Sequence, residues 1–374
     1  MKYFIVAAEA SGDLHASNLV KGLKTYDPDA EIVGWGGDLM EQQGVKILKH
    51  ISELSFMGFA EVLKNIRTIF KNFEICYKQI EELKPDAVIL VDSPGFNLRV
   101  AKHIFGKVPR VYYYISPTVW AWHRSRMYTI RDYTNKMFVI LPFEKDFYAR
   151  YGIDVYYEGH PLLDVISPFP DITLRSHSHS HSHSHSDIVS LLPGSRPQEV
   201  SAILPVMLGA AKKLGDKYTY VLAAAPNIDD SFYRTIILDF PIKLSRDGTR
   251  AVLDKSIAAM VTSGTATLET GLYSIPQVVC YVTSSVSFSI AKMLVNIKYI
   301  SLVNIILNEP LLKELIQKEL NIDSLHNEML KILPGGERRN EILNGYKRLR
   351  GLIGEPGASS RIAKIMHEDL CAIS

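Results

Sequence analysis

Asp92 has the residue type and the position that general-base chemistry requires. It follows the apolar run DAVILV and precedes SPGFN, so it should stand at the carboxyl end of a central strand. Open parallel sheets bind ligands at that edge, where a carboxylate can accept a proton from a substrate hydroxyl. An Asp that only caps the following turn would give the same sequence, and position alone leaves both interpretations open.

Two segments, at 3–20 and 187–204, have the pattern of an apolar strand, a small-residue turn and a helix start. Such turns direct backbone N–H groups and the positive end of a helix dipole at an anion, which suits phosphate. In the second turn, a planar guanidinium could grip a diphosphate through two hydrogen bonds. In the first, helix capping is an equally good explanation. The candidate ligand-binding residues are Ser11, Gly12, Asp13, Gly194, Ser195 and Arg196.

A third strand–turn–helix junction reads SGTATLE. Its first residues, Ser263, Gly264 and Thr265, could again bind phosphate through backbone N–H groups. Glu269 lies about one and a half turns into the predicted helix and could accept hydrogen bonds from a ribose, or could be a solvated or capping Glu.

The segment ISPTVWAWHRSR brings aromatic and cationic side chains together just after a predicted strand. Aromatic rings beside cations suit sugar stacking or an anionic head group, although paired Trp residues also anchor cores. The residues concerned are Trp120, Trp122, His123, Arg124 and Arg126.

Residues 54–83 predict an amphipathic helix preceded by an apolar stretch. Core packing is the favoured explanation for the main stripe, which includes Phe73, Cys76 and Ile80. Lys and Arg residues border it, so one face could instead lie on an anionic membrane. The candidates for lipid contact are Leu54, Phe56, Met57 and Phe59.

Apolar strand-like runs alternate with helical periodicity in both halves of the chain, which predicts an α/β fold with parallel sheets covered on both faces. The alternation breaks after His160 at Pro-rich sequence and a Ser-His repeat. We therefore predict domains over 1–165 and 187–374, joined by a linker over 166–186, with the last helix packing back on the first domain. The repeat could bind a metal, but a linker or tag-like insertion is the favoured interpretation.

The 374 residues carry a net charge of +2, which gives no reason to propose nucleic-acid binding. Neither a secretory signal nor a membrane span is expected, so we predict a cytoplasmic protein. Cys76, Cys280 and Cys371 are far apart and are expected to be reduced packing residues, with no metal site or cofactor.

The blocks AAEASGD, FMGFAEVL, VDSPGFN, SPTVWAWHRSR, LPFEKDFY, LLPGSRPQEV, TSGTATLE and KYISLVNIILNEPLLKELIQ, in this order, resemble the lipid A disaccharide synthase family over nearly the whole chain. The resemblance implies a GT-B architecture, in which two Rossmann-like domains with parallel sheets face a central cleft. It also implies a peripheral enzyme of the inner membrane surface of a Gram-negative bacterium, and leaves a homodimer open.

The reaction implied by the resemblance joins UDP-2,3-diacylglucosamine to 2,3-diacylglucosamine 1-phosphate (lipid X), giving a β-1,6-linked disaccharide and UDP with inversion. The family's functional aspartate falls on Asp92, its phosphate-contacting arginine on Arg196, its substrate-site serine on Ser11, and an asparagine of its SLPN motif on Asn304.

Two departures from the family pattern are visible, and two other functions stay open. Ala8 replaces a usual Gly, and Gly95 stands where many members have a second acid. None of the blocks that carry the resemblance contains an Asp-x-Asp motif, which is consistent with a metal-free mechanism. The alternatives are a UDP-N-acetylglucosamine 2-epimerase-like isomerase, which needs no lipid-facing entrance, and a non-enzymatic UDP-sugar sensor, which would tolerate loss of Asp92.

Overall fold

The computed structural model of the chain has two compact units. Unit 1 comprises Met1–Ser167 and Ile353–Ser374, and unit 2 comprises Pro168–Leu352. The sequence predicts a second domain that extends to residue 374, with its last helix packing back on the first domain. In the structure, residues 353–374 belong to unit 1. The structure describes residues 1–54, 66–166, 187–284, 288 and 297–373.

Unit 1 is built on a seven-stranded sheet in the order β3-β2-β1-β4-β5-β6-β7. Every pairing in it is parallel. The central strands are buried on both faces, as near-continuous apolar runs predict. The strands are β1 (Lys2–Ala7), β2 (Glu31–Gly36), β3 (Lys46–His50), β4 (Ala87–Val91), β5 (Arg110–Tyr114), β6 (Lys136–Val139) and β7 (Tyr156–Tyr157).

Helices cover both faces of this sheet, because successive strand residues point to opposite sides. On one face, Val88, Leu90 and Tyr113 belong to a core with residues of α4, α5 and α6. On the other face, Ile89 and Tyr112 belong to a core with residues of α1 and α18. The helices of unit 1 are α1 (Ala10–Tyr26), α2 (Asp38–Gln42), α4 (Ile66–Leu83), α5 (Pro94–Ile104), α6 (Arg126–Tyr133), α7 (Glu144–Ala149), α8 (Leu163–Ile166) and α18 (Ala358–Cys371), with a 3-10 turn at Ile51–Glu53.

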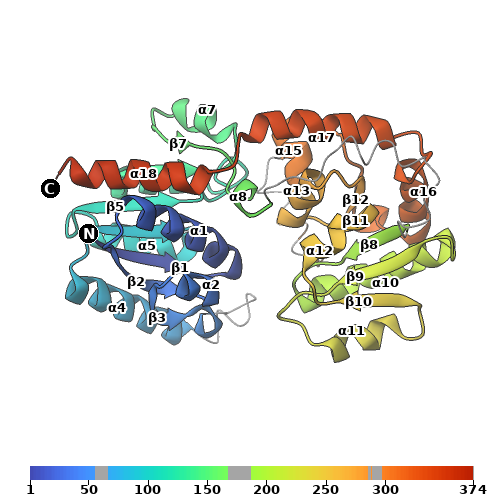
Figure 1. Cartoon of the computed structure of the whole chain (residues 1–374), viewed down its shortest axis with the longest axis horizontal. Helices are drawn as coiled ribbons and strands as arrows, with labels where there is room; N and C mark the ends of the chain where they lie inside the picture. Colours follow the sequence, from blue (N-terminus) through green and yellow to red (C-terminus); the bar gives the residue numbers. More distant parts are fainter. Residues whose placement is uncertain (55–65, 167–186, 285–287, 289–296, 374) are drawn as a thin grey trace. The chain divides into compact units, whose positions relative to one another are not determined.

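The C-terminal helix α18 lies against α1, although more than 300 residues separate them in sequence (Figure 1). The close approach depends on Gly22, where an added Cβ would come 2.9 Å from the Cβ of Ala363. The first turn of α18 is capped from α8, because the Asp164 carboxylate accepts hydrogen bonds from the backbone N–H groups of Gly357, Ala358 and Ser359. Residues 353–374 are thus an integral part of unit 1.

Unit 2 has a six-stranded sheet in the order β10-β9-β8-β11-β12-β13, again parallel throughout. The predicted α/β class with two parallel sheets is therefore confirmed. Its strands are β8 (Ile188–Leu192), β9 (Thr219–Ala223), β10 (Ile242–Ser245), β11 (Ser256–Thr262), β12 (Gln277–Tyr281) and β13 (Glu314–Ile316). Its helices are α10 (Pro197–Leu214), α11 (Asp230–Ile237), α12 (Thr249–Asp254), α13 (Thr265–Leu272), α15 (Leu302–Leu307), α16 (Ile322–Ile332) and α17 (Arg339–Ile353), with a 3-10 turn at Gln317–Glu319.

Burial tests two further sequence predictions. Phe73, Cys76 and Ile80 of α4 are buried in the core, which confirms the packing interpretation of the main helical stripe. Cys280 is buried as predicted, but the prediction is wrong for Cys371, whose place in the last turn of α18 leaves it exposed. Within the described ranges, no helix is long and apolar enough to cross a membrane.

Candidate functional site

The carboxyl edge of the unit 1 sheet has a topological switch point between β1 and β4. The chain leaves these two adjacent strands toward opposite faces of the sheet, into α1 and α5. Ala7 pairs with Val91, so the β1–α1 turn and Asp92 begin side by side at the same edge. Switch points of this kind are where open α/β sheets bind ligands.

Asp92 stands at this switch point in an unusual backbone conformation. Its φ is 49°, and Ser93, next in the chain, has a φ of 42°. Ile115, which directly follows the neighbouring strand β5, has a φ of 71°. Positive φ values cost non-glycine residues about 1–3 kcal/mol each, and a β-branched residue adopts them rarely. Three such residues at one sheet edge are a mark of a functional site.

The electrostatics of Asp92 suit a proton acceptor. Burial raises the pKa of its carboxyl from 3.8 to about 6, and the negative charge of Glu9 adds to the increase, while a hydrogen bond from the Ser93 backbone opposes it. A base with a pKa just below neutrality is ionised at pH 7 yet still holds a proton well. Sequence reasoning did not single out Glu9, although an acid at the start of the β1–α1 turn was a usable signal.

Two buried side chains hold the backbone carbonyl of Asp92. The Tyr113 hydroxyl donates to it at 2.6 Å, and Nδ2 of Asn97 donates to it at 2.9 Å. Sequence reasoning missed both residues. Asn97 lies within the SPGFN block and Tyr113 within the strand run RVYYY, but nothing in those letters shows where either side chain points.

The three predicted residues of the first turn have different environments. Ser11 is exposed at the start of α1, where it is free to meet a ligand, and Gly12 is buried against the end of β1. The Asp13 carboxylate accepts hydrogen bonds from the backbone N–H groups of Gly37, Leu39 and Met40. Asp13 therefore fixes the β2–α2 turn, and its carboxylate is already committed to the fold.

Unit 2 has its own switch point between β8 and β11, and two of the predicted phosphate-binding turns meet there. Leu192 pairs with Val261, so the turns that follow the two strands are adjacent. Gly194 has a φ of 110° and Gly264 a φ of 153°, values that favour glycine. Both turns lead into helices, α10 and α13, whose N-terminal N–H groups are suited to an anion.

Arg196 is the cation at this switch point. It is the N-cap residue of α10, its side chain is 63% exposed, and its Nη1 lies 3.1 Å from Glu199 Oε1. An exposed ion pair of this kind contributes little to stability, so the guanidinium is available to an incoming anion. Ser195 and Thr265 are exposed beside the two turns, while Ser263 donates its hydroxyl to Ile300 O at 2.9 Å.

The two remaining candidates of unit 2 are engaged by neighbouring groups. Glu269 is paired with Arg250, with 3.0 Å between Oε1 and Nε, and burial raises the pKa of its carboxyl while that pairing opposes the increase. Asn304 is 1% exposed; its Nδ2 donates to Leu312 O and Glu314, and its Oδ1 accepts from Leu312 N. Asn304 thus fastens α15 to the β13 region.

The aromatic loop after β5 contains one partly buried ring and one exposed ring. Trp120 packs edge-on against Phe143, with 5.2 Å between ring centroids. Trp122 is 38% exposed and lies under the Arg126 guanidinium at 5.2 Å. The two interpretations of this segment therefore apply to different residues: core anchoring fits Trp120, and a stacking surface with a cation fits Trp122.

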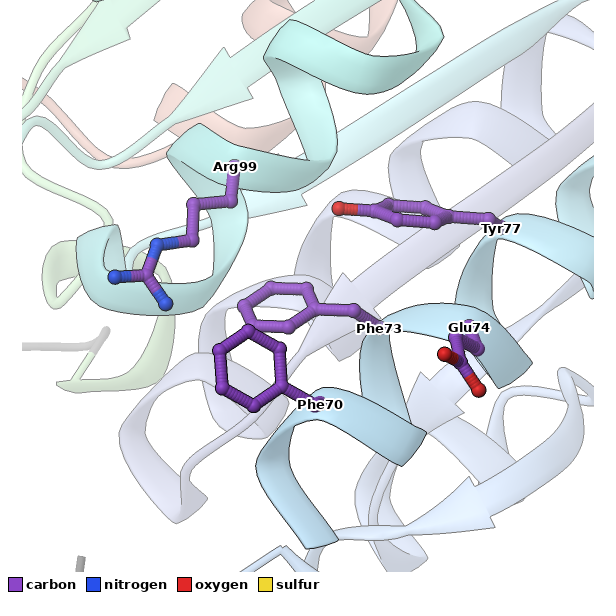
Figure 2. Close-up of a pocket in the computed structure, with 5 residues that line it drawn as sticks. All are labelled: Phe70, Phe73, Glu74, Tyr77 and Arg99. Carbon is purple, nitrogen blue, oxygen red and sulfur yellow. The ribbon is translucent and has the colours of Figure 1, made fainter. Parts of the chain in front are cut away.

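A surface hollow of about 380 Å³ lies between α4 and α5 (Figure 2). Phe70, Phe73 and Tyr77 line it from α4 together with Glu74, and Arg99 approaches from α5. Phe70 is 58% exposed. Of the predicted lipid-contact residues, Leu54 packs partly buried against the core beside α4. Phe56, Met57 and Phe59 lie outside the described residues, as does the Ser-His repeat.

Comparison with known proteins decides the family. A family model described as lipid-A-disaccharide synthetase matches residues 3–364. The chain belongs to the lipid-A-disaccharide synthase family. The lipid-A-disaccharide synthase of Syntrophus aciditrophicus (strain SB) is 39% identical over 96% of this chain and 95% of its own length. That of Myxococcus xanthus (strain DK1622) is 36% identical over 98% and 97%.

Solved structures of similar fold agree with the GT-B architecture of this family. The UDP-GlcNAc 2-epimerase of Neisseria meningitidis, bound to UDP-GlcNAc, has a TM-score of 0.65 at 11% identity, covering 98% of this chain and 100% of its own. The calicheamicin glycosyltransferase CalG4 has a TM-score of 0.62 at 10% identity, covering 100% and 99%. At these identities the likeness concerns the fold alone. The family membership makes the protein a hexosyltransferase of lipid A biosynthesis.

Proposed function

We propose that this synthase transfers the 2,3-diacylglucosamine group of its UDP-sugar donor to 2,3-diacylglucosamine 1-phosphate, with inversion at the anomeric carbon. The observation that carries the proposal is the half-buried Asp92 at the switch point of unit 1, with its pKa raised to about 6. The carboxylate accepts the proton of the acceptor's 6-hydroxyl. The oxygen then bonds to the anomeric carbon, whose bond to the diphosphate breaks, and UDP leaves with the electron pair.

The leaving diphosphate is assigned to unit 2. Negative charge grows on it as the glycosidic bond breaks, and donors oriented in advance stabilise such charge most effectively. The N–H groups at the starts of α10 and α13 are fixed donors, and the exposed Arg196 guanidinium can bind two oxygens at once. Ser11 is proposed to contact the acceptor, and Glu269 the ribose while it stays paired with Arg250.

The lipid side is assigned to unit 1, at a membrane surface. The hollow in Figure 2 offers aromatic rings for an acyl chain, with the Arg99 cation next to it. Phe70, which is 58% exposed, adds apolar surface to α4, and the predicted contact residues Phe56, Met57 and Phe59 precede it in the sequence. Apolar side chains next to basic ones favour an anionic bilayer surface.

The decisive experiment measures disaccharide and UDP from the two acylated substrates in detergent micelles with EDTA, comparing wild type with Asp92→Asn. We expect metal-independent product from wild type and a loss of about a hundredfold or more in the variant, since a general base contributes that much. Asp86→Asn is the matched control. Asp86 precedes the same strand at its opposite end, where its carboxylate accepts a hydrogen bond from Lys2 N, and it should leave turnover unchanged.

Two outcomes would contradict the proposal. Full activity of Asp92→Asn would remove Asp92 as the base while keeping the transfer reaction. Interconversion of UDP-sugar epimers without an acceptor, and no disaccharide, would instead favour the epimerase chemistry of the similarly folded proteins.

A further inference from the structure

We propose that Tyr113 and Asn97 are positioning residues for the reaction: they hold the backbone of Asp92 in its left-handed conformation, and the alignment of the Asp92 carboxylate with the acceptor hydroxyl depends on them. The inference rests on the proposed role of Asp92 as general base. Neither side chain needs to touch the substrate.

The hydrogen bonds converge on one atom, the carbonyl oxygen of Asp92. Tyr113 donates its hydroxyl at 2.6 Å, and Asn97 donates Nδ2 at 2.9 Å. Both donors are fully buried, so water does not compete for them. Burial and the nearby Asp92 charge raise the pKa of Tyr113 well above its ordinary value, so its hydroxyl keeps the proton that it donates.

Asn97 also links Asp92 to the two central strands, β1 and β4, through hydrogen bonds. The same Nδ2 lies 3.0 Å from the carbonyl oxygen of Val91, which ends β4, and 3.4 Å from that of Val6 in β1. The backbone N–H of Asn97 donates to Ser93 O at 2.9 Å, which holds the start of α5 against the turn. One amide group therefore ties the strained residue to both strands of the switch point.

Because the backbone of Asp92 is strained, loss of these hydrogen bonds should change the position of its carboxylate. With a φ of 49°, the Asp92 backbone is in a conformation that an L-residue leaves when nothing holds it. Rotation of the freed peptide would carry the carboxylate away from its place and into water. A displacement of about 1 Å between reacting groups costs on the order of a hundredfold in rate.

The test is Tyr113→Phe, which removes one hydroxyl and keeps the ring in the core. We expect kcat to fall by about tenfold or more, with an unchanged KM for both substrates. The acidic limb of the kcat–pH profile should move to lower pH, because a better solvated Asp92 has a pKa closer to its ordinary value of 3.8. Loss of packing alone would reduce active protein without moving that limb.

Tyr112→Phe is the matched control. Tyr112 is the adjacent, equally buried residue of β5, and its hydroxyl bonds to Asp369 of α18 on the opposite face of the sheet. The Tyr112→Phe enzyme should keep the wild-type kcat and the wild-type kcat–pH profile. Asn97→Ala, provided that circular dichroism shows it folded, should shift the same limb as Tyr113→Phe.

A Tyr113→Phe enzyme with the kcat and acidic limb of Tyr112→Phe would overturn the inference, as would a loss of activity matched by loss of folded protein. This failure is distinct from that of the proposed function. If Asp92→Asn is inactive while Tyr113→Phe behaves like its control, only the positioning role is lost; if Asp92→Asn is fully active, the base assignment itself is wrong.

Discussion

At Asp92 two requirements oppose each other. The carboxylate must be ionised to accept a proton, yet its place at the sheet edge removes it from water and sets it near the charge of Glu9. A carboxyl whose pKa rises on folding is more stable protonated, so folding is favoured below the ordinary pKa of 3.8 and this contribution is lost as the pH rises through about 6. At neutral pH the raised pKa of Asp92 therefore lowers the stability of the fold, while it makes the carboxylate a stronger base.

We therefore predict that Asp92→Asn is more stable to unfolding than wild type at pH 8, because Asn carries no charge. The pKa of about 6, against 3.8, corresponds to at most about 3 kcal/mol, and partial exposure reduces it. At pH 3 the difference should nearly vanish, since wild-type Asp92 is then mostly protonated in both the folded and the unfolded state. Thermal unfolding at both pH values measures this, and equal stability at pH 8 would contradict it.

The positions of some side chains could be predicted from residue type and from the ends of predicted strands. The positions of others could not. Asp92, Arg196 and the turns at Gly194 and Gly264 follow from local pattern, because a βα junction is a local structure. The partners of Asp13, by contrast, are backbone groups of residues 37–40, and those of Asn304 are in residues 312–314. Such pairings depend on how distant turns approach each other, which local pattern does not contain.

At the scale of elements, several helices are capped by carboxylates far away in sequence. Asp13 binds the start of α2, and Glu314 binds the N–H groups of Ile300 and Ser301 ahead of α15. Asp164 caps α18 across 195 residues. Each pairing satisfies donors that a helix start leaves open and fixes the position of the helix as well.

For Asp164→Ala we predict a loss of about 1–2 kcal/mol in the local stability of α18, because three backbone donors lose their acceptor. Hydrogen exchange should become faster in the first turn of α18 and in the part of α1 that it covers. The comparison variant is Asn321→Ala, which removes the side-chain cap of α16 at Ser324 N. Unchanged exchange in α18 of Asp164→Ala would show that packing on α1 alone holds the helix.

At the scale of the whole molecule, two units of the same class each carry a switch point with different chemistry. Unit 1 has a carboxylate in a strained turn, and unit 2 has two adjacent glycine turns with a cation. The alternation of strands and helices predicted this division into two parallel sheets. The strand order of each sheet was not predictable, because nothing local states which strands are neighbours.

From this division we predict that UDP, added without the acceptor, binds to unit 2 and leaves unit 1 unchanged. Hydrogen exchange at the turns around Gly194 and Gly264 should slow when UDP is added, while the Asp92 turn stays unaffected. Arg196→Ala should weaken UDP binding by at least about tenfold, since charge-assisted hydrogen bonds contribute about 1.5–3 kcal/mol. Asp92→Asn should bind UDP as wild type does. Protection at the Asp92 turn, or a loss of UDP affinity in Asp92→Asn, would contradict the assignment.

The return of α18 to unit 1 has a consequence for biosynthesis. A ribosome releases the residues of β1 to β7 first, but the part of α1 that α18 covers stays uncovered until Ile362, Met366 and Leu370 have emerged. Unit 2, whose residues all precede residue 353, has its complete sequence earlier. We therefore expect the hydrophobic surface beneath α18 to stay exposed until the residues of α18 have emerged. Unit 1, although its strands are made first, should then complete its fold only after all of unit 2 has been made.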